Sequence, residues 1–309
     1  MPKILVIGST NVDFVMRMDR LPARGETVTD AQFLQTFGGK GANTAVSAAR
    51  TGPAHKTTFI TALGDDLYAP TLLANFKADH LDTSHIILRK NLATGSALIM
   101  CDKDGANYLS VAPGSNYALT PADIDKDAGL IRTANLVILQ MEIRVDTLQR
   151  ILQLCEDAGV PVLFNFAPVR TTEIPVSSQM TGLVVNEHEA SQLTSLPVHD
   201  LATARPAAAE LLKRGPKFVA ITLGAAGVYL LGAGNDIHLP AFKVAAVDTT
   251  AAGDTFCGAL AVALVEGLPL PAALRFASAA SAISVTRLGA QPSIPTRAEV
   301  DAFLAENPA

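Results

Sequence analysis

Residues 3–8 read KILVIG, an apolar run with the length of a single β-strand. Continuous apolar runs of this kind are typical of strands that a parallel sheet buries on both faces. Similar runs recur along the chain: NLVILQ at 135–140, PVLFNF at 161–166, GLVVN at 182–186 and FVAITLG at 218–224. Helix-like stretches such as VDTLQRILQLCEDAG separate them. The alternation predicts an α/β fold with a doubly wound, mostly parallel sheet flanked by helices, which binds ligands at the carboxyl ends of its strands.

Two segments depart from this alternation of strand and helix. Residues 14–39 and 94–115 carry partial period-two alternation and turn residues, which suit antiparallel strands. We therefore expect a small antiparallel β lid with strands from about 14–37 and 94–112, able to close over a substrate and exclude water. The length of 309 residues then predicts a single domain over 1–309 that carries this lid.

Composition and charge exclude several classes of protein. With 49% hydrophobic and 17% charged residues the chain is expected to be globular. Its net charge of -5, without a dense Lys/Arg cluster, argues against nucleic acid and against an anionic membrane as partners. Cys101, Cys155 and Cys257 lack the number and spacing of a disulfide framework or a zinc site. The start does not resemble a signal peptide and no apolar stretch reaches membrane-spanning length, so we predict a cytoplasmic protein.

Ala251-Ala252-Gly253-Asp254 is the strongest chemical motif of the sequence. It follows the strand-like FKVAAVDTT and opens the helical run TFCGALAVALVEG. A small turn at a helix start presents unpaired backbone N–H groups and the positive end of the helix dipole, which together bind anions. An aspartate at this place can accept a hydroxyl proton while the N–H groups hold a transferring phosphoryl group. A simple capping role for Asp254 is the alternative.

Residues 38–43 read GGKGAN and lead into a second helical run. The spacing differs from GxxxxGK[ST], and no Ser or Thr follows Lys40 to bind magnesium, so the segment is not a P-loop. Glycines that allow close approach of the backbone, with Lys40 and Asn43 pointing inward, suit a polyol substrate. The alternative is a tight turn with a solvated lysine.

Two further polar pairs follow predicted strands. Asn11 and Asp13 lie on one face of the chain, where an amide and a carboxylate can bind adjacent hydroxyls, although strand-end polar residues also occur as loop caps. Asn186 and Glu189 share one face of a predicted helix, as a pair that positions the hydration shell of magnesium would. A capping pair is the alternative for these two residues.

In this order the motifs resemble those of the PfkB carbohydrate kinase family. The likeness covers nearly the whole chain, from GSTNVD through PARGETV, FGGKGAN, GDD, LQME, NEHEA, ITLGAAGV and AVDTTAAGDTF to RFASAASAISVTRLGAQPSIP. It implies an ATP-dependent sugar kinase that phosphorylates the 5-hydroxyl of D-ribose to give D-ribose 5-phosphate. A kinase of 2-deoxyribose, of another sugar or of a nucleoside remains an alternative, and a non-catalytic sugar-binding regulator is a remote one. The pair Asn11 and Asp13, with GGKGAN and GAQPS, favours ribose over a nucleoside.

The resemblance also implies roles for individual residues. Asp254 would be the catalytic base, and Ala251, Ala252 and Gly253 would form the anion hole. The sugar would contact Asn11, Asp13, Gly39, Lys40, Asn43, Glu142 and Asp254. ATP would contact Asn186, Thr222, Gly224, Gly227, Gly253 and Ser278, although Ser278 stands where many members of the family carry a larger residue, often His.

Two cations belong to the implied machinery. Mg²⁺ would be positioned by Asn186 and Glu189 through water. K⁺ would lie near the anion hole among oxygens, mostly backbone carbonyls, of Asp248, Thr250, Ser284, Arg287, Gly289 and Ser293. The resemblance further implies a homodimer formed through the lid, whose sheet would otherwise leave apolar surface and pairing edges in water.

Overall fold

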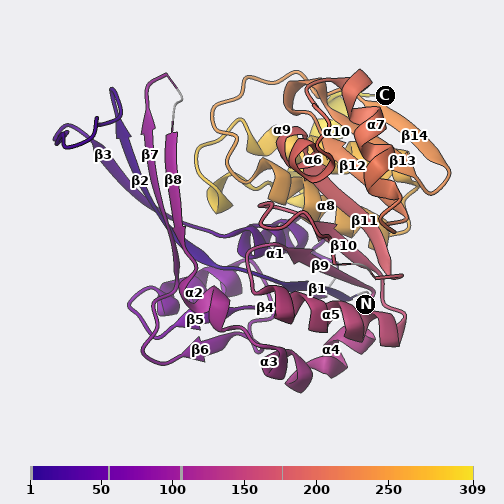
Figure 1. Cartoon of the computed structure of the whole chain (residues 1–309), viewed down its shortest axis with the longest axis horizontal. Coiled ribbons are helices and arrows are strands. Elements are labelled where there is room, and N and C mark those ends of the chain that lie inside the picture. Colours follow the sequence, from indigo (N-terminus) through magenta and orange to yellow (C-terminus); the bar gives the residue numbers. More distant parts are fainter. Residues whose placement is uncertain (1–2, 55, 105–106, 176, 309) are drawn as a thin grey trace.

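The structure is a computed structural model that describes residues 3–54, 56–104, 107–175 and 177–308. Eight strands form the central sheet in the order β14-β13-β12-β11-β10-β9-β1-β4 (Figure 1). Neighbours from β4 to β12 run parallel, whereas β13 and β14 add an antiparallel edge. The strands are β1 Lys3–Ile7, β4 Lys56–Ile60, β9 Leu136–Gln140, β10 Val162–Asn165, β11 Met180–Asn186, β12 Phe218–Thr222, β13 Val228–Gly232 and β14 Asn235–Leu239.

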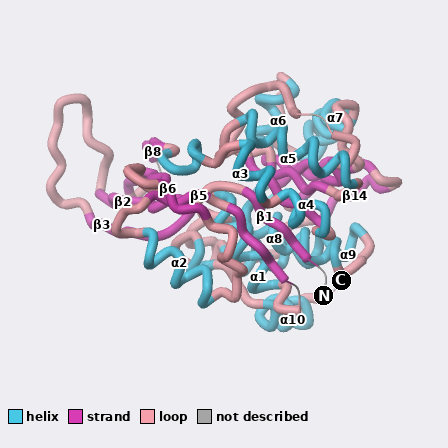
Figure 2. Tube along the Cα trace, turned by 90° about the horizontal axis from the view of Figure 1, so that it is seen from below, coloured by secondary structure: helices cyan, strands magenta, loops and turns pink. Residues whose placement is uncertain are grey.

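Helices cover both faces of this sheet (Figures 1 and 2). One face packs against α1 Lys40–Thr51, α2 Ala69–Ala78, α8 Ala252–Val265, α9 Leu270–Ser284 and α10 Arg297–Glu306. The other packs against α3 Pro121–Lys126, α4 Ala128–Thr133, α5 Val145–Ala158, α6 Glu187–Thr194 and α7 Leu201–Leu212. Three short 3₁₀ helices are η1 Gly114–Ala118, η2 Gly224–Ala226 and η3 Gln291–Ser293.

Strand β1 shows why the apolar run is continuous. Ile4 and Val6 belong to the core on one face of the sheet, and Leu5 and Ile7 belong to the core on the other. All four are at most 2% exposed. Because each such side chain contributes about 1.5–3 kcal/mol when it is fully buried, both faces of the strand select apolar residues. The predicted α/β class with a doubly wound, mostly parallel sheet is confirmed.

A separate four-stranded sheet lies beside the core in the order β3-β2-β7-β8 (Figure 1). Its strands are β2 Asn11–Met18, β3 Gln32–Gly38, β7 Gly95–Asp102 and β8 Asn107–Ala112, and the short pair β5 Ala62–Gly64 and β6 Ile87–Arg89 lies elsewhere. The two outer pairs are antiparallel as expected, but the central pair of β2 and β7 is parallel, so the lid sheet is mixed. Residues 105 and 106, within the predicted lid, lie outside the described residues.

The lid sheet carries large apolar side chains in water. Phe33 is 60% exposed and Leu109 is 62% exposed. Leu34, Leu98, Tyr108 and Val111 are also exposed. The loop between β2 and β3 extends away from the body of the molecule (Figure 2).

The extent of the predicted domain, residues 1–309, stays a prediction.

None of the helices in the described part of the chain combines the length and the apolar composition that a bilayer crossing requires. The three cysteines are free thiols, with Cys155 and Cys257 buried and Cys101 half-buried.

Candidate active site

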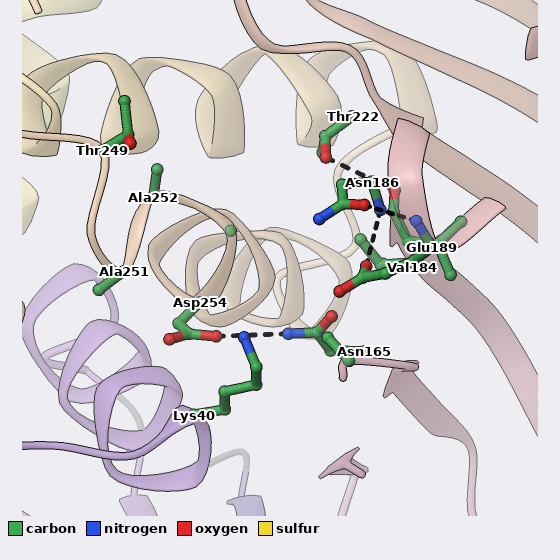
Figure 3. A pocket seen from close by; sticks show the side chains of 13 residues that line it. Lys40, Asn165, Val184, Asn186, Glu189, Thr222, Thr249, Ala251, Ala252 and Asp254 are labelled. Carbon is green, nitrogen blue, oxygen red and sulfur yellow. Dashed lines mark hydrogen bonds between the residues drawn. The ribbon is translucent and has the colours of Figure 1, made fainter. Parts of the chain in front are cut away.

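The start of α8 forms one wall of a cavity of about 200 Å³ (Figure 3). Ala251, the residue before the helix, has the left-handed backbone conformation with φ 60°, and the helix begins at the next residue. The amides of Gly253 and Asp254 lie in the first helical turn, where N–H groups have no acceptor within the helix. The cavity is lined by Lys40, Asn165, Ala167, Val184, Val185, Asn186, Glu189, Thr222, Thr249, Ala251, Ala252, Gly253 and Asp254.

Asp254 is held at the base of this cavity by two amide side chains. Its Oδ2 accepts a hydrogen bond from Nδ2 of Asn43 at 2.9 Å, and its Oδ1 accepts one from Nδ2 of Asn165 at 3.4 Å. Asp254 as a whole residue is 5% exposed. Burial raises its pKa, while the charge of Lys40 and the hydrogen bond from Asn43 work in the opposite direction. The arrangement keeps a proton acceptor next to the unpaired amides of a helix start.

Lys40 supplies the positive charge of the site from the first position of α1. Burial alone would lower the pKa of its ammonium, but the carboxylates of Asp254, Glu142 and Glu189 together raise it. The ammonium is therefore charged at neutral pH and balances three acidic groups that come from different elements. In Figure 3 its side chain points toward Asp254.

Glycines 38, 39 and 41 bring α1 against the end of β1. Gly39 has φ 89°, and a Cβ added there would lie 2.8 Å from the amide nitrogen of Asn11. A Cβ on Gly41 would lie 2.4 Å from the amide nitrogen of Ser9. This close approach allows the Lys40 amide to donate a hydrogen bond to Oε2 of Glu142 at 2.9 Å, and the Ser9 hydroxyl donates to the same oxygen. The glycine motif thus joins Glu142 to the start of α1.

Asn11 and Asp13 lie at the base of the lid strand β2, next to this junction. Both are buried, and Oδ1 of Asn11 accepts a hydrogen bond from Nδ2 of Asn116 at 2.8 Å. Burial, together with the negative charges of Glu142 and Asp254, raises the pKa of Asp13 to about 7. The space beside Asp13 is tight, since a Cβ on Gly38 would lie 2.1 Å from its Oδ2.

The raised pKa of Asp13 predicts a pH-dependent stability. The pKa of the Asp13 carboxyl rises from 3.8 to about 7 on folding, so the folded state binds this proton more tightly than the unfolded state does. The contribution of the protonated carboxyl to the free energy of unfolding is complete below pH 3.8 and is lost as the pH rises through about 7. Asparagine cannot ionise. Asp13→Asn should therefore raise the melting temperature relative to the unsubstituted chain by an amount that grows from pH 4 to pH 8, reaching a few degrees. Scanning calorimetry across this pH range measures the effect, with substitution of the exposed Asp125 by asparagine as the control. A gain in melting temperature that does not depend on pH would refute the prediction.

Asn186 and Glu189 cap a helix and also line the cavity, so the capping role is confirmed and the magnesium role stays a prediction. They form a capping box at the start of α6, in which Oδ1 of Asn186 accepts from the Glu189 amide at 2.8 Å and Oε2 of Glu189 accepts from the Asn186 amide at 2.9 Å. Both also line the cavity. Burial raises the pKa of Glu189, partly offset by the Asn186 amide and by Lys40. Within the described ranges, no three acidic, His or Cys side chains gather as a direct metal cage.

Of the residues predicted to contact ATP, Asn186, Thr222 and Gly253 line the cavity, whereas Gly224, Gly227 and Ser278 do not. Gly224 lies just beyond the cavity, exposed in η2. Gly227 has φ 97°, and an added Cβ would lie 2.0 Å from the Leu239 carbonyl oxygen, so the backbone itself requires glycine there. Ser278 is half-buried on α9 and is not among the lining residues.

Asp248 ties together the loops that were predicted to hold a monovalent cation. Its Oδ1 accepts from the amide and hydroxyl of Thr250, and its Oδ2 accepts from the Gly289 amide at 2.9 Å. Burial opposes ionisation, but these hydrogen bonds and Arg17 lower the pKa of Asp248. Arg17, on lid strand β2, lies 3.8 Å from the same carboxylate. Asp248 thereby connects the loop that precedes α8 to the loop that contains Gly289 and to lid strand β2.

The other predicted cation residues adjoin these loops. The Arg287 amide donates to the Ser284 carbonyl oxygen at 3.1 Å. The Arg287 guanidinium donates to the Glu299 carboxylate on α10. The Ser293 hydroxyl donates to the Ala290 carbonyl oxygen. Backbone carbonyls, together with Asp248, are the groups that this region offers to a cation.

Sequence reasoning missed several polar residues of the site. Ser9 and Asn116 support Glu142 and Asn11, and Asn165 contacts Asp254. Asn165 had a detectable signal, since it is the one polar residue in PVLFNF and stands where ligand-binding strand ends were expected. Asn116 follows a loop and gave no such signal.

Comparisons with known proteins identify the family to which the chain belongs. Residues 1–297 match the pfkB family carbohydrate kinases. The chain is 40% identical to a bifunctional ribokinase/ribose-5-phosphate isomerase A of Fructilactobacillus sanfranciscensis over 96% of this chain, and it spans 55% of that longer relative. It is 38% identical to ribokinase of Bacillus subtilis, covering 98% of this chain and 100% of the relative. It is 32% identical to deoxyribokinase of Salmonella typhi, covering 98% and 99%.

A solved structure of Arabidopsis thaliana ribokinase complexed with ribose and ATP superposes on this chain with a TM-score of 0.89. The two are 34% identical, and the match covers 98% of each chain. Fold, motif order and sequence identity therefore agree along the full length, and the chain belongs to the pfkB family of carbohydrate kinases.

Proposed function

We propose that this protein is a ribokinase, which transfers the γ-phosphoryl group of ATP to the 5-hydroxyl of D-ribose. The observation that carries the proposal is the position of Asp254, a buried carboxylate held by Asn43 beside the unpaired amides of the α8 start. Ribokinase relatives at 38–40% identity, against 32% for a deoxyribokinase, support ribose as the substrate. The other sugar and nucleoside kinases of the family are the competing assignments.

The proposed sugar site lies between the lid base and α1. Asn11 and Asp13 offer an amide and a carboxylate on one face of β2. Glu142 accepts from the Lys40 amide at the glycine junction, and Asn43 on α1 donates to Asp254. Carboxylates and amides of this kind accept and donate hydrogen bonds to several hydroxyls of a furanose at once. Gly39 lets the backbone approach the ring closely because it carries no side chain.

Asp254 is the proposed base for the transfer step. It takes the proton from the sugar 5-hydroxyl as that oxygen forms its bond to the γ-phosphorus, and the bond from phosphorus to the bridging β-phosphate oxygen breaks to leave ADP. The amides of Gly253 and Asp254, together with the helix dipole, offset the negative charge of the transferring group. The amide of Ala252 donates instead to the Thr249 carbonyl oxygen at 3.2 Å. ATP is expected to enter along Asn186, Thr222 and Gly224, with Gly227 and Ser278 farther from the reacting atoms.

Two cations complete the proposal. Glu189 and Asn186 fit Mg²⁺ held through water, because Mg²⁺ keeps much of its hydration shell and needs only one or two carboxylates in addition to phosphate oxygens. When bound, Mg²⁺ neutralises charge on the β- and γ-phosphates. The region around Asp248 and Thr250 fits K⁺, because it presents carbonyl oxygens beside a carboxylate whose pKa is lowered.

The lid is also proposed to join two copies of the chain. Phe33, Leu98 and Tyr108 are exposed on one face of the lid sheet, and monomers rarely leave an apolar face of this kind in water. A homodimer through this face, and a cytoplasmic location, remain predictions; sedimentation as a monomer at micromolar concentration would count against the dimer.

ATP consumption against D-ribose, 2-deoxyribose, fructose and adenosine, each with and without K⁺, tests the proposed function. We expect D-ribose to give the highest kcat/KM and K⁺ to raise it. A preference for 2-deoxyribose or adenosine would change the substrate but keep the base and the anion hole. Sugar binding without turnover on any of these acceptors would instead favour a non-catalytic sugar-binding protein.

A further inference from the structure

Asn165 ends strand β10 at the carboxyl edge of the sheet, opposite Gln140 of β9. Successive residues of a strand point to opposite faces. Phe164 and Phe166 are both fully buried in the core on one face, where their rings lie 5.2 Å apart. Leu163 belongs to the core on the other face, under α8. Asn165 therefore shares the face of Leu163 and is directed toward the start of α8.

The backbone around Asn165 fixes this direction. The Phe166 amide donates to the Val184 carbonyl oxygen at 3.0 Å, and the Ala167 amide donates to the Asn165 carbonyl oxygen at 2.9 Å. The neighbours of Asn165 in sequence, Phe164 and Phe166, are also held in place because their aromatic rings are fully buried. Asn165 itself is 5% exposed, lines the cavity and reaches Asp254 with its Nδ2 (Figure 3).

We propose that Asn165 is a positioning residue for the base, which holds the carboxylate plane of Asp254 together with Asn43 and keeps a lone pair of the carboxylate aimed at the sugar hydroxyl. The proposal rests on the proposed function of the chain. Each carboxylate oxygen has two lone pairs. One amide occupies a lone pair on Oδ2 and the other occupies one on Oδ1, so rotation of the carboxylate would break both hydrogen bonds. A fixed plane keeps the acceptor in attack geometry, which misplacement of about 1 Å would degrade severely.

The amide hydrogen bond also acts on the ionisation of the base. The charged groups around Asp254 are Lys40 on α1, Glu142 after β9, Glu189 on α6 and Asp13 on β2, and the buried Cys257 thiol follows on α8. Lys40 favours the carboxylate form, whereas burial and the neighbouring acids oppose it. An N–H donor favours the charged form without adding charge to the cluster. Loss of the Asn165 donor is therefore expected to raise the pKa of Asp254.

Single-turnover phosphoryl transfer from ATP to D-ribose, followed by rapid quench from pH 5 to pH 9, tests the role of Asn165. This measurement isolates the chemical step from product release. Asn165→Leu preserves the approximate size of the side chain without a donor, and Asn165→Asp preserves its shape but adds a negative charge. We expect Asn165→Leu to lower the plateau rate about tenfold and to move the acidic limb upward by about half to one pH unit. Asn165→Asp should move the limb further, because two neighbouring carboxylates disfavour joint ionisation.

Gln140→Met is the matched control. Gln140 is the register partner of Asn165, is fully buried, and has no hydrogen-bond partner for its side-chain amide within the described part of the chain. Its replacement should leave both the plateau rate and the acidic limb unchanged.

The outcomes separate this inference from the proposed function. Failure of the unsubstituted chain to phosphorylate D-ribose would overturn the proposed function. Normal transfer by that chain, with Asn165→Leu and Asn165→Asp altering only the melting temperature or only the affinity for ribose, would overturn the role of Asn165 and leave the function intact. A shifted acidic limb in both variants, absent in Gln140→Met, supports positioning of the base.

Discussion

Replacing Asp254 with asparagine is expected to lower the rate of phosphoryl transfer at least about a hundredfold, the scale on which loss of a general base acts. Asparagine has nearly the same shape but cannot take the hydroxyl proton. It retains one side-chain oxygen that can accept from Asn43 or Asn165. Affinity for ribose, measured by calorimetric titration, should change far less than the rate.

Stability separates this chemical loss from unfolding. Burial raises the pKa of Asp254 in the fold, so ionisation of the carboxyl costs stability as the pH rises, and a neutral side chain avoids that cost. The melting temperature of Asp254→Asn at pH 8 should therefore be equal to or higher than that of the unsubstituted chain. Asp146→Asn is the control, because Asp146 lies in the first turn of α5 and is exposed. A turnover of Asp254→Asn within about threefold of that control would remove Asp254 from the role of base.

The central sheet was predictable because burial of a strand on both faces requires a continuous run of apolar residues, which can be seen in the sequence. β1 and β10 are buried by helices on both sides, and each reads as a short continuous apolar run. The lid was predicted less completely. Alternation identified β2 and β7 as strands, but nothing local to either segment determines that the two pair in parallel across about 80 residues.

The candidate site shows the same contrast between features that are local in the sequence and contacts that only the fold creates. Asp254 and GGKGAN were predictable because the glycines and the helix start lie beside the functional side chains in sequence. Asn186 and Glu189 remained ambiguous for a good reason: the spacing that caps a helix also places both residues at the cavity, and the structure contains both features. Asn165 depends on contact with a residue 89 positions away, and only the fold brings the two together.

Gly253→Ala is expected to change activity and stability in opposite directions. A Cβ added at Gly253 meets no protein atom within 4 Å, and Gly253 lines the cavity at the second position of α8. Alanine is favoured over glycine within a helix by up to about 1 kcal/mol, so the melting temperature should stay the same or rise. The methyl group would, however, stand where a phosphoryl group must approach the amides of the α8 start. Loss of one such donor contact costs about a hundredfold or more in rate, and partial obstruction should cost at least about tenfold.

Gly129→Ala provides the matched control for this substitution. Gly129 is the second residue of α4, is exposed, and likewise has no atom within 4 Å of an added Cβ. It should gain similar stability without any loss of transfer rate. If Gly253→Ala transferred phosphate as fast as Gly129→Ala, a phosphoryl group would not need the space beside Gly253, and the anion hole would have to lie elsewhere along the cavity. A slow but fully folded Gly253→Ala, with ribose affinity retained, would place the obstruction on the phosphate side of the site and not on the sugar side.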